Sequence, residues 1–255
     1  MRGHIAFAFL IILLATIPQV NAYFNATYLT TTVFLTNSTT ARVVESIQLY
    51  IGNSSVSAYN QDRQAFNLSL NDWQKAIGSP FLVEHILNPK GSISNFTFLP
   101  GPLALVGNGG GYASLTISYE AYNVTSIIAL APRKFEYTFN STVFNFLHTA
   151  SGQSLPTNAK LTITVPIGAQ IAAIYPVPDS PQQNSVGQYN STSFSWFSGE
   201  PLKKFTFTYI VTETPQQEVV QYFNYIYSTY TSLIYMLILL AIVAIGLYIY
   251  VKIFR

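Results

Sequence analysis

The stretch YASLTISYEAY, residues 112–122, alternates apolar with polar side chains over most of its length. Because successive side chains of a strand point to opposite faces, this period of two predicts a strand with one buried and one solvated face. Eight further stretches share the pattern and are rich in β-branched and aromatic residues; they are residues 26–36, 42–51, 64–70, 92–99, 133–140, 159–167, 191–197 and 203–213. Turn-like stretches such as LPGP, GNGGG and DSPQQNS separate them. The sequence therefore predicts an all-β body of one or two antiparallel β-sandwiches of the Ig-like kind.

One internal helix is expected between the two ends of the chain. Residues 70–78, LNDWQKAIG, have a helical pattern. Asn71 is a suitable N-cap for this helix, and Gly78 is a suitable stop at its C-terminal end.

Length alone does not decide the number of sandwiches, because residues 23–215 suffice for one large domain or for two of about 100 residues. An internal echo favours two: ASLTIS followed by IIALAP resembles AKLTIT followed by IAAIYP, and RKFEYTF resembles KKFTFTY. We therefore expect a first domain at residues 23–131 and a second at residues 132–215. Pro215 would end the last strand before a juxtamembrane segment, residues 216–231.

The C-terminal part of the chain predicts a transmembrane helix. Residues 232–251 are an almost unbroken apolar run without a charge, and at about 1.5 Å per residue they cover the roughly 30 Å of bilayer hydrocarbon. Tyrosines cluster on both sides of the run, as in interfacial aromatic belts. Lys252 and Arg255 in the tail, residues 252–255, place that tail in the cytoplasm by the positive-inside rule.

The N-terminal part predicts a signal peptide, residues 1–22. Arg2 supplies a positive start, residues 5–17 an apolar core, and Ala22 a small residue at the cleavage site. A retained signal anchor is the competing interpretation. Cleavage would give a single-pass type I protein of the cell membrane, with residues 23–231 extracellular and membrane lipid around its one helix.

The charge of the outer portion argues against nucleic acid as a partner. Its ten acidic and nine basic residues nearly balance, and clustered Lys and Arg with interleaved aromatics are missing. Charged residues make up 9% of the chain, whereas about 25% is usual in soluble domains. Another hydrophilic group must therefore keep this surface in water.

Asparagine-linked sugars are the candidate for that group. Eight of the seventeen asparagines lie in Asn-x-Ser/Thr sequons, where chance would place about three. The predicted N-glycosylation sites are Asn25, Asn37, Asn53, Asn67, Asn95, Asn123, Asn140 and Asn190. An Asn-, Ser- and Thr-rich β protein can also gather sequons by composition alone. If the sites are occupied, their spread predicts that sugars cover much of the outer surface and leave few open faces.

Cysteine is absent, although exported domains of this size often carry disulfides. With the sequons, the low charge and the single C-terminal helix, the chain resembles membrane-anchored cell-surface glycoproteins of thermoacidophilic archaea in general character. The resemblance covers the whole chain and implies a surface role. The membrane anchors of archaeal S-layers carry a long coiled coil, whereas residues 216–231 show no sustained heptad.

Motifs for catalysis or cofactor binding are weak, so we expect no enzyme, no cofactor and no metal. The loop at residues 107–111, GNGGG, lacks the Lys-Ser/Thr of a P-loop, and a strand is expected to follow it. His85 and His148 have no spacing that supports a haem or an acid–base pair. Blue copper needs a Cys ligand. The ten carboxylates are scattered, and the pairs 133–134 and 203–204 are expected to be solvated strand ends.

The leading hypothesis is a non-enzymatic, N-glycosylated surface protein that presents its β-sandwich to other cell-envelope or membrane proteins. Tethering raises the effective concentration of neighbours on the same membrane, so weak contacts suffice. Three alternatives remain: an accessory subunit of a membrane enzyme or transport complex, an extracellular acid hydrolase, and a viral envelope glycoprotein.

Overall fold

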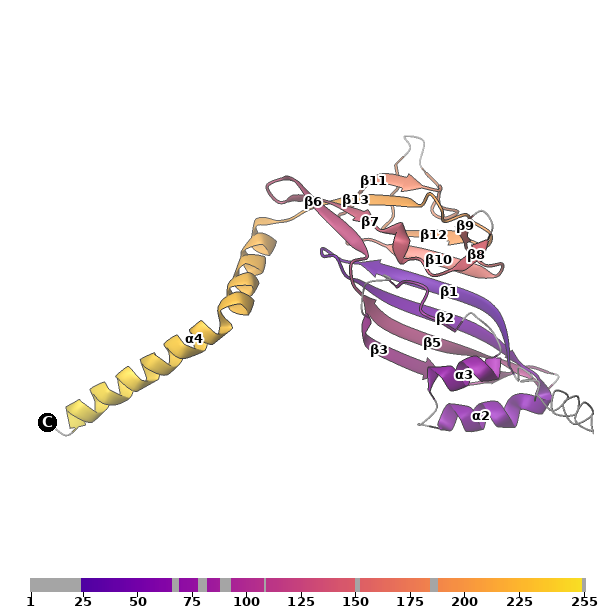
Figure 1. Cartoon of the computed structure of the whole chain (residues 1–255), viewed down its shortest axis with the longest axis horizontal. Coiled ribbons are helices and arrows are strands. Elements are labelled where there is room, and N and C mark those ends of the chain that lie inside the picture. Colours follow the sequence, from indigo (N-terminus) through magenta and orange to yellow (C-terminus); the bar gives the residue numbers. More distant parts are fainter. Residues whose placement is uncertain are drawn as a thin grey trace, which may run out of the picture.

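The computed structural model describes residues 24–65, 69–77, 82–87, 93–107, 109–149, 152–183 and 188–253 (Figure 1). The predicted signal peptide, residues 1–22, lies outside these residues. Within them, the chain is rich in strands, forms two main β-sheets, and ends in one long apolar helix. The predicted β-rich class with a C-terminal apolar helix is confirmed.

The larger sheet has seven strands. Its order is β12 (Ser193–Phe197), β10 (Ala159–Thr164), β1 (Asn25–Leu35), β2 (Ala41–Ile51), β5 (Gly111–Ala121) and β3 (Ile93–Pro100), with the short β4 (Ala104–Leu105) also on β5. β1 and β10 pair in parallel, and the other pairs in this sheet are antiparallel. The parallel pair departs from the purely antiparallel sandwich that the sequence predicts.

The predicted alternation is confirmed in the central strands of this sheet. In β2 and β5 every second side chain is buried, and the buried positions meet across the strands, as Ile47 opposite Leu115 does. The positions between them, such as Ser46 opposite Thr116, lie on the outward face. A period of two therefore gives this sheet one apolar and one hydroxyl-rich face.

The smaller sheet packs on the side of β10 and β12. Its order is β11 (Gln170–Tyr175), β13 (Thr206–Thr212), β7 (Lys134–Phe139) and β6 (Thr125–Ala131), and a separate hairpin pairs β8 (Leu147–Thr149) with β9 (Gly152–Ser154). The ring centroids of Phe194 and Phe207 are 5.5 Å apart, and those of Trp196 and Phe205 are 5.0 Å apart. Such edge-on aromatic contacts join the two sheets across the core.

Two short helices cover the other side of the core. In α2 (Val56–Gln64) and α3 (Leu70–Ile77), the buried residues include Tyr59 and Trp73, whose ring centroids lie 5.8 Å apart. Trp73 also contacts Phe98 of β3, with ring centroids 5.9 Å apart. Single 3₁₀ turns lie at Asn53–Ser55 and Ser141–Val143.

The helical region corrects two sequence predictions. A strand was expected at residues 64–70, but Gln64 ends α2 and Leu70 begins α3. The helix is capped by Ser69 and not by Asn71: the Asp72 carboxylate accepts hydrogen bonds from the Ser69 backbone N–H at 3.0 Å and from its hydroxyl at 2.7 Å. The Ser69 hydroxyl oxygen in turn accepts a hydrogen bond from the Asp72 backbone N–H at 3.3 Å, which completes a capping box. Gly78, the predicted stop, lies outside the described residues.

Strands from both sides of residue 132 share the same sheets. β1 pairs with β10, with Thr31 opposite Leu161, and β6 and β7 form a hairpin whose turn contains residue 132. The buried apolar residues of both halves belong to one hydrophobic cluster. The described strands therefore form one two-sheet domain, which replaces the boundary expected between residues 23–131 and residues 132–215.

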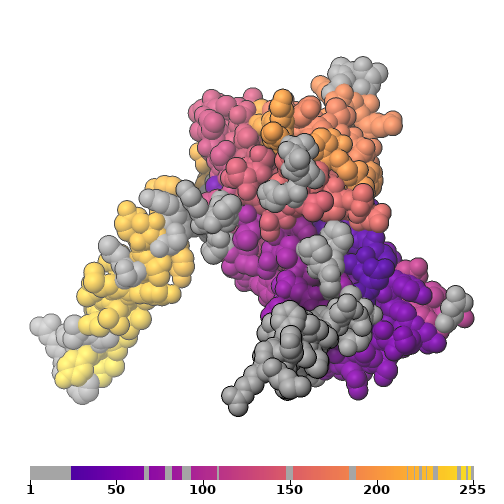
Figure 2. All heavy atoms as spheres, turned by 45° about the vertical axis from the view of Figure 1, so that its right-hand side comes forward, coloured from indigo at the N-terminus to yellow at the C-terminus, as the bar shows by residue number. Residues whose placement is uncertain are grey.

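The last helix, α4 (Pro215–Ile253), leaves this domain, and most of its described side chains are exposed (Figures 1 and 2). Its apolar part, Thr229–Tyr250, has a mean hydropathy of 2.6 and is long enough to cross a membrane. The helix bends at Tyr230, where the backbone angles, φ −116° and ψ 20°, depart from helical values. The predicted span at residues 232–251 coincides with the part of α4 beyond this bend.

Candidate interaction surface

The described sequon asparagines lie in turns and at strand ends or sheet edges. Exposed side chains are Asn25, Asn37, Asn53, Asn95, Asn123 and Asn190, and Asn140 is half-buried. The eighth, Asn67, lies outside the described residues. The side-chain oxygen of Asn140 accepts hydrogen bonds from the backbone and the hydroxyl of Thr142, at 3.1 and 2.8 Å. The side-chain nitrogen, where a sugar would attach, is not used in these two bonds.

The sequons gather at the two ends of the large sheet. Asn37, Asn123 and Asn140 lie together at one end, because the backbone N–H of Asn140 and the carbonyl of Val124 are 2.8 Å apart and Val124 in turn donates to Thr39 at 2.8 Å. Asn25 and Asn53 flank the opposite end of β1 and β2.

Of the remaining described sequons, Asn95 sits in an irregular part of the edge strand β3, and Asn190 precedes β12. Among the described sequons, Asn25 lies on the outward face of β1, β2 and β5, at its end opposite Tyr50, and the hydroxyl rows themselves carry none. The sequence prediction that few faces stay open meets a clear exception here.

This outward face is built from hydroxyl side chains in register. Rows run across β1, β2 and β5, with Thr30, Ser46 and Thr116 in one row and Thr32, Val44 and Ser118 in the next. Three strands spaced about 4.8 Å apart make rows roughly 10 Å wide. The rows offer hydroxyl donors and acceptors at a regular spacing.

Aromatic side chains border these rows. Tyr50 and Tyr112, which are opposite one another on β2 and β5, are partly exposed and have ring centroids 5.4 Å apart. At another border the Lys160 ammonium lies 5.5 Å from the centroid of the Phe197 ring. Because the face combines stacking surfaces with hydroxyls and few charges, it suits an uncharged polar ligand better than an anion.

A separate polar cluster lies inside the core. The Glu45 carboxylate accepts hydrogen bonds from the backbone N–H of His85 at 2.8 Å and from the hydroxyl of Tyr119 at 2.6 Å. Its other oxygen is 2.6 Å from Nδ1 of His85. The Tyr119 oxygen accepts a hydrogen bond from the backbone N–H of Ile86 at 3.1 Å. The cluster therefore fixes residues 82–87 to the inward face of β2 and β5.

Burial excludes this cluster as an open catalytic site. Glu45 is 0% exposed and His85 is 3% exposed, and the His85 ring stacks on Phe146 with centroids 5.0 Å apart. Burial, together with the neighbouring Glu45 carboxylate, raises the pKa of the Tyr119 phenol far above its ordinary value. The phenol therefore stays a hydrogen-bond donor, and the three groups satisfy one another.

The pairing of His85 with Glu45 was not predicted, although the sequence carries a signal for it. Glu45 occupies the same strand phase as Val43, Ile47 and Leu49, all of which are buried. A carboxylate at a position that alternation assigns to the core indicates a buried partner. His148 lies on β8, in a different sheet from the residues around His85.

The other motifs that the sequence suggested lie outside both the outward face and the Glu45 cluster. The strand β5 follows the glycine loop at residues 107–111, as predicted, and the loop is closed by a 2.8 Å hydrogen bond from Val106 N–H to the Gly110 carbonyl. Lys203 and Lys204 lie in a turn before β13. Among the described residues no group of three His, Asp or Glu could hold a metal ion.

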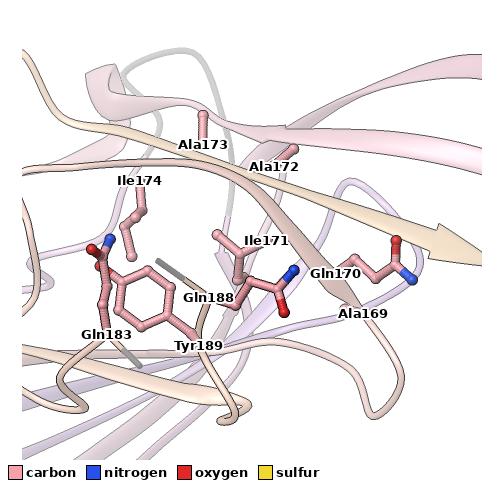
Figure 3. A pocket seen from close by; sticks show the side chains of 9 residues that line it. All are labelled: Ala169, Gln170, Ile171, Ala172, Ala173, Ile174, Gln183, Gln188 and Tyr189. Atoms are coloured by element: carbon pink, nitrogen blue, oxygen red, sulfur yellow. The ribbon is translucent and has the colours of Figure 1, made fainter. Parts of the chain in front are cut away.

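The edge strand β11 borders an open hollow of about 560 Å³ (Figure 3). Its lining comes from Ala169 to Ile174 and from Gln183, Gln188 and Tyr189. The Gln183 amide donates a 2.9 Å hydrogen bond to the Tyr189 hydroxyl. No carboxylate, imidazole or amine is among these lining side chains, so the hollow offers no acid–base pair.

Comparisons with known proteins add little. Neither the comparison with protein-family models nor that with curated proteins finds a match. Among solved structures, the NMR structure of the folded domain of the LppM protein of Mycobacterium tuberculosis is similar at 10% sequence identity with a TM-score of 0.22, over 76% of this chain and 92% of that one. A likeness at this level supports no conclusion about fold or function.

Proposed function

We propose that this chain is a single-pass type I surface glycoprotein whose sandwich binds another component of the cell envelope through the outward face of the large sheet. The observation that carries the proposal is the position of the sequons, which flank this face and leave its hydroxyl rows open. Sugars at those sites would keep the ends of the sandwich in water. The apolar part of α4 would hold the domain near its partner.

The chemistry of the face limits the kind of partner. Arg42 and Glu120 lie opposite one another on β2 and β5, so their charges balance. The remaining outward positions of these strands are mainly hydroxyls and tyrosines. We therefore infer an uncharged polar partner surface. The resemblance to archaeal surface glycoproteins and the Ig-like character of the sandwich stay predictions.

The test places a charge in the middle of the face. Ser46→Arg lies in the central hydroxyl row, and Ser57→Arg, on the exposed side of α2, is the matched control. Tagged full-length protein is crosslinked in its native membrane, extracted and purified, and the co-purifying envelope components are quantified. We expect Ser46→Arg to lose most of a component that the control retains. Equal recovery by both variants would contradict the proposal.

A further inference from the structure

The hairpin formed by β6 and β7 projects from the sandwich beside the start of α4 (Figure 1). Ile128 is 57% exposed and Leu130 is 48% exposed, and Ile127, whose side chain points to the opposite face of the strand, is also exposed. Apolar side chains on both faces of a strand are unusual in water. The tip also carries two basic residues, Arg133 and Lys134, both exposed.

The hairpin is fastened to the beginning of α4. The backbone N–H of Glu213 donates a hydrogen bond of 2.8 Å to the Arg133 carbonyl. The Arg133 guanidinium lies 3.6 Å from the Glu218 carboxylate in the first turn of α4. These two contacts hold the hairpin tip beside the first turn of the helix, close to the segment that leads into the apolar span.

That leading segment is itself apolar on its surface. Val219, Val220, Tyr222 and Phe223 are all more than half exposed. About 14 residues separate the start of α4 from the apolar span, a length of roughly 21 Å. If this segment stood upright in water, all four side chains would stay uncovered. The bend at Tyr230 gives it a direction different from that of the span.

We propose that the β6–β7 hairpin and the first part of α4 rest together on the outer surface of the membrane that α4 crosses. The inference rests on the proposed anchoring. Ile128 and Leu130 enter the interfacial layer, and Lys134 meets lipid phosphates. Lipid is the favoured partner because the α4 part of the patch runs without a break into the apolar span, and because the patch combines tyrosine, aliphatic and basic side chains, as interfacial segments do. The acidic residues beside the tip are Glu136 on β7, Glu213 before α4 and Glu218 in the first turn of α4.

The chain contains no cysteine, so one introduced cysteine can carry an environment-sensitive fluorophore at a single site. Leu130→Cys tests the hairpin. Leu105→Cys is the control, because Leu105 is 67% exposed and lies on β4. That strand pairs with the start of β5, whereas the β6–β7 hairpin follows the end of β5. Met236→Cys reports on the span. Full-length protein is reconstituted into phosphatidylcholine vesicles with or without phosphatidylglycerol, and quenching by lipids that carry a quencher is measured.

We expect quenching at position 130 by shallow quenchers, at position 236 by deep quenchers, and little quenching at position 105. Lys134→Gln should reduce quenching at position 130 at least twofold in the anionic vesicles and leave it unchanged in phosphatidylcholine. Quenching at position 236 without quenching at position 130 would overturn the inference and leave the anchoring intact. Failure at position 236 would overturn both. Shielding of position 130 in native membranes, but not in vesicles, would identify a protein partner and refute the lipid assignment.

Discussion

Removing the Glu45 carboxylate tests whether the buried cluster stabilises the fold. In Glu45→Ala, the His85 backbone N–H and the Tyr119 hydroxyl lose their shared acceptor, at present 2.8 and 2.6 Å away. The His85 ring also loses its partner at 2.6 Å. Breaking a buried, hydrogen-bonded pair by removing one member costs about 3–5 kcal/mol. The free energy of unfolding should fall by that amount.

The two tryptophans make the measurement direct. Trp73 and Trp196 are both buried, on different sides of the core. Their fluorescence can follow guanidinium unfolding of the full-length protein in detergent. In a thermal experiment, about 2–4 °C per kcal/mol for a domain of this size translates the loss into a drop of roughly 6–20 °C.

The matched control is Glu120→Ala. Glu120 lies on the outward face of β5, next to Tyr119 in the sequence, and its carboxylate is 3.3 Å from the Ser94 hydroxyl. A surface change of this kind should alter the free energy of unfolding by about 0.5 kcal/mol or less. The reasoning is refuted if Glu45→Ala stays within about 1 kcal/mol of the parent chain, or if both variants lose the same amount.

Two further predictions concern Tyr59 in the core and the glycine loop at residues 107–111. Burial raises the pKa of Tyr59 from 10.0 to about 12, with Arg63 partly opposing it, so the stability that the protonated phenol gives should be complete below pH 10 and be lost as the pH rises through 12. Tyr59→Phe should flatten that loss when unfolding is followed at alkaline pH. An unchanged pH profile would contradict the prediction. In the glycine loop, a Cβ at Gly111 would lie 2.4 Å from the Ala104 carbonyl oxygen, whereas nothing lies within 4 Å of a Cβ at Gly107. Gly111→Ala should therefore lower the free energy of unfolding in denaturant by about 1–3 kcal/mol, and Gly107→Ala should lower it by almost nothing. Equal effects of the two variants would disprove the steric argument.

Local pattern predicted the central strands of the large sheet well, because burial there follows alternation. Residues 112–122 were expected as a strand with one buried face, and β5 has that face at every second position. The apolar run at residues 232–251 likewise predicted the helix, since its length and lack of charge need no partner to be recognised. Both features depend only on neighbouring residues.

The arrangement of the strands could not be derived in this way. The parallel pairing of β1 with β10 joins segments more than a hundred residues apart, and nothing in either alternating stretch specifies its partner. The internal echo misled for the same reason, because exposed-and-buried alternation makes unrelated strands look alike. The helix α2 was missed because Tyr59 is its only buried residue, so it has no apolar stripe.

The candidate surface and the Glu45 cluster could also be predicted only in part. Sequons are visible in the sequence, but their gathering at the sheet ends depends on turn contacts such as that between Val124 and Thr39. The Glu45 cluster needed three segments, at residues 45, 85 and 119, to meet. A single misplaced polar residue in the apolar phase of β2 was the one sign of it in the sequence.

The low charge of the chain has an explanation beyond sugars. The outward positions of β1, β2 and β5 carry Thr30, Ser46, Thr116 and their neighbours, which hold water through hydroxyls in place of charges. A face hydrated in this way costs less to uncover than a charged one, because hydroxyls are desolvated more cheaply than ions and can exchange water for a partner's polar groups. The same residues can therefore keep the sheet hydrated and suit the uncharged partner that we propose.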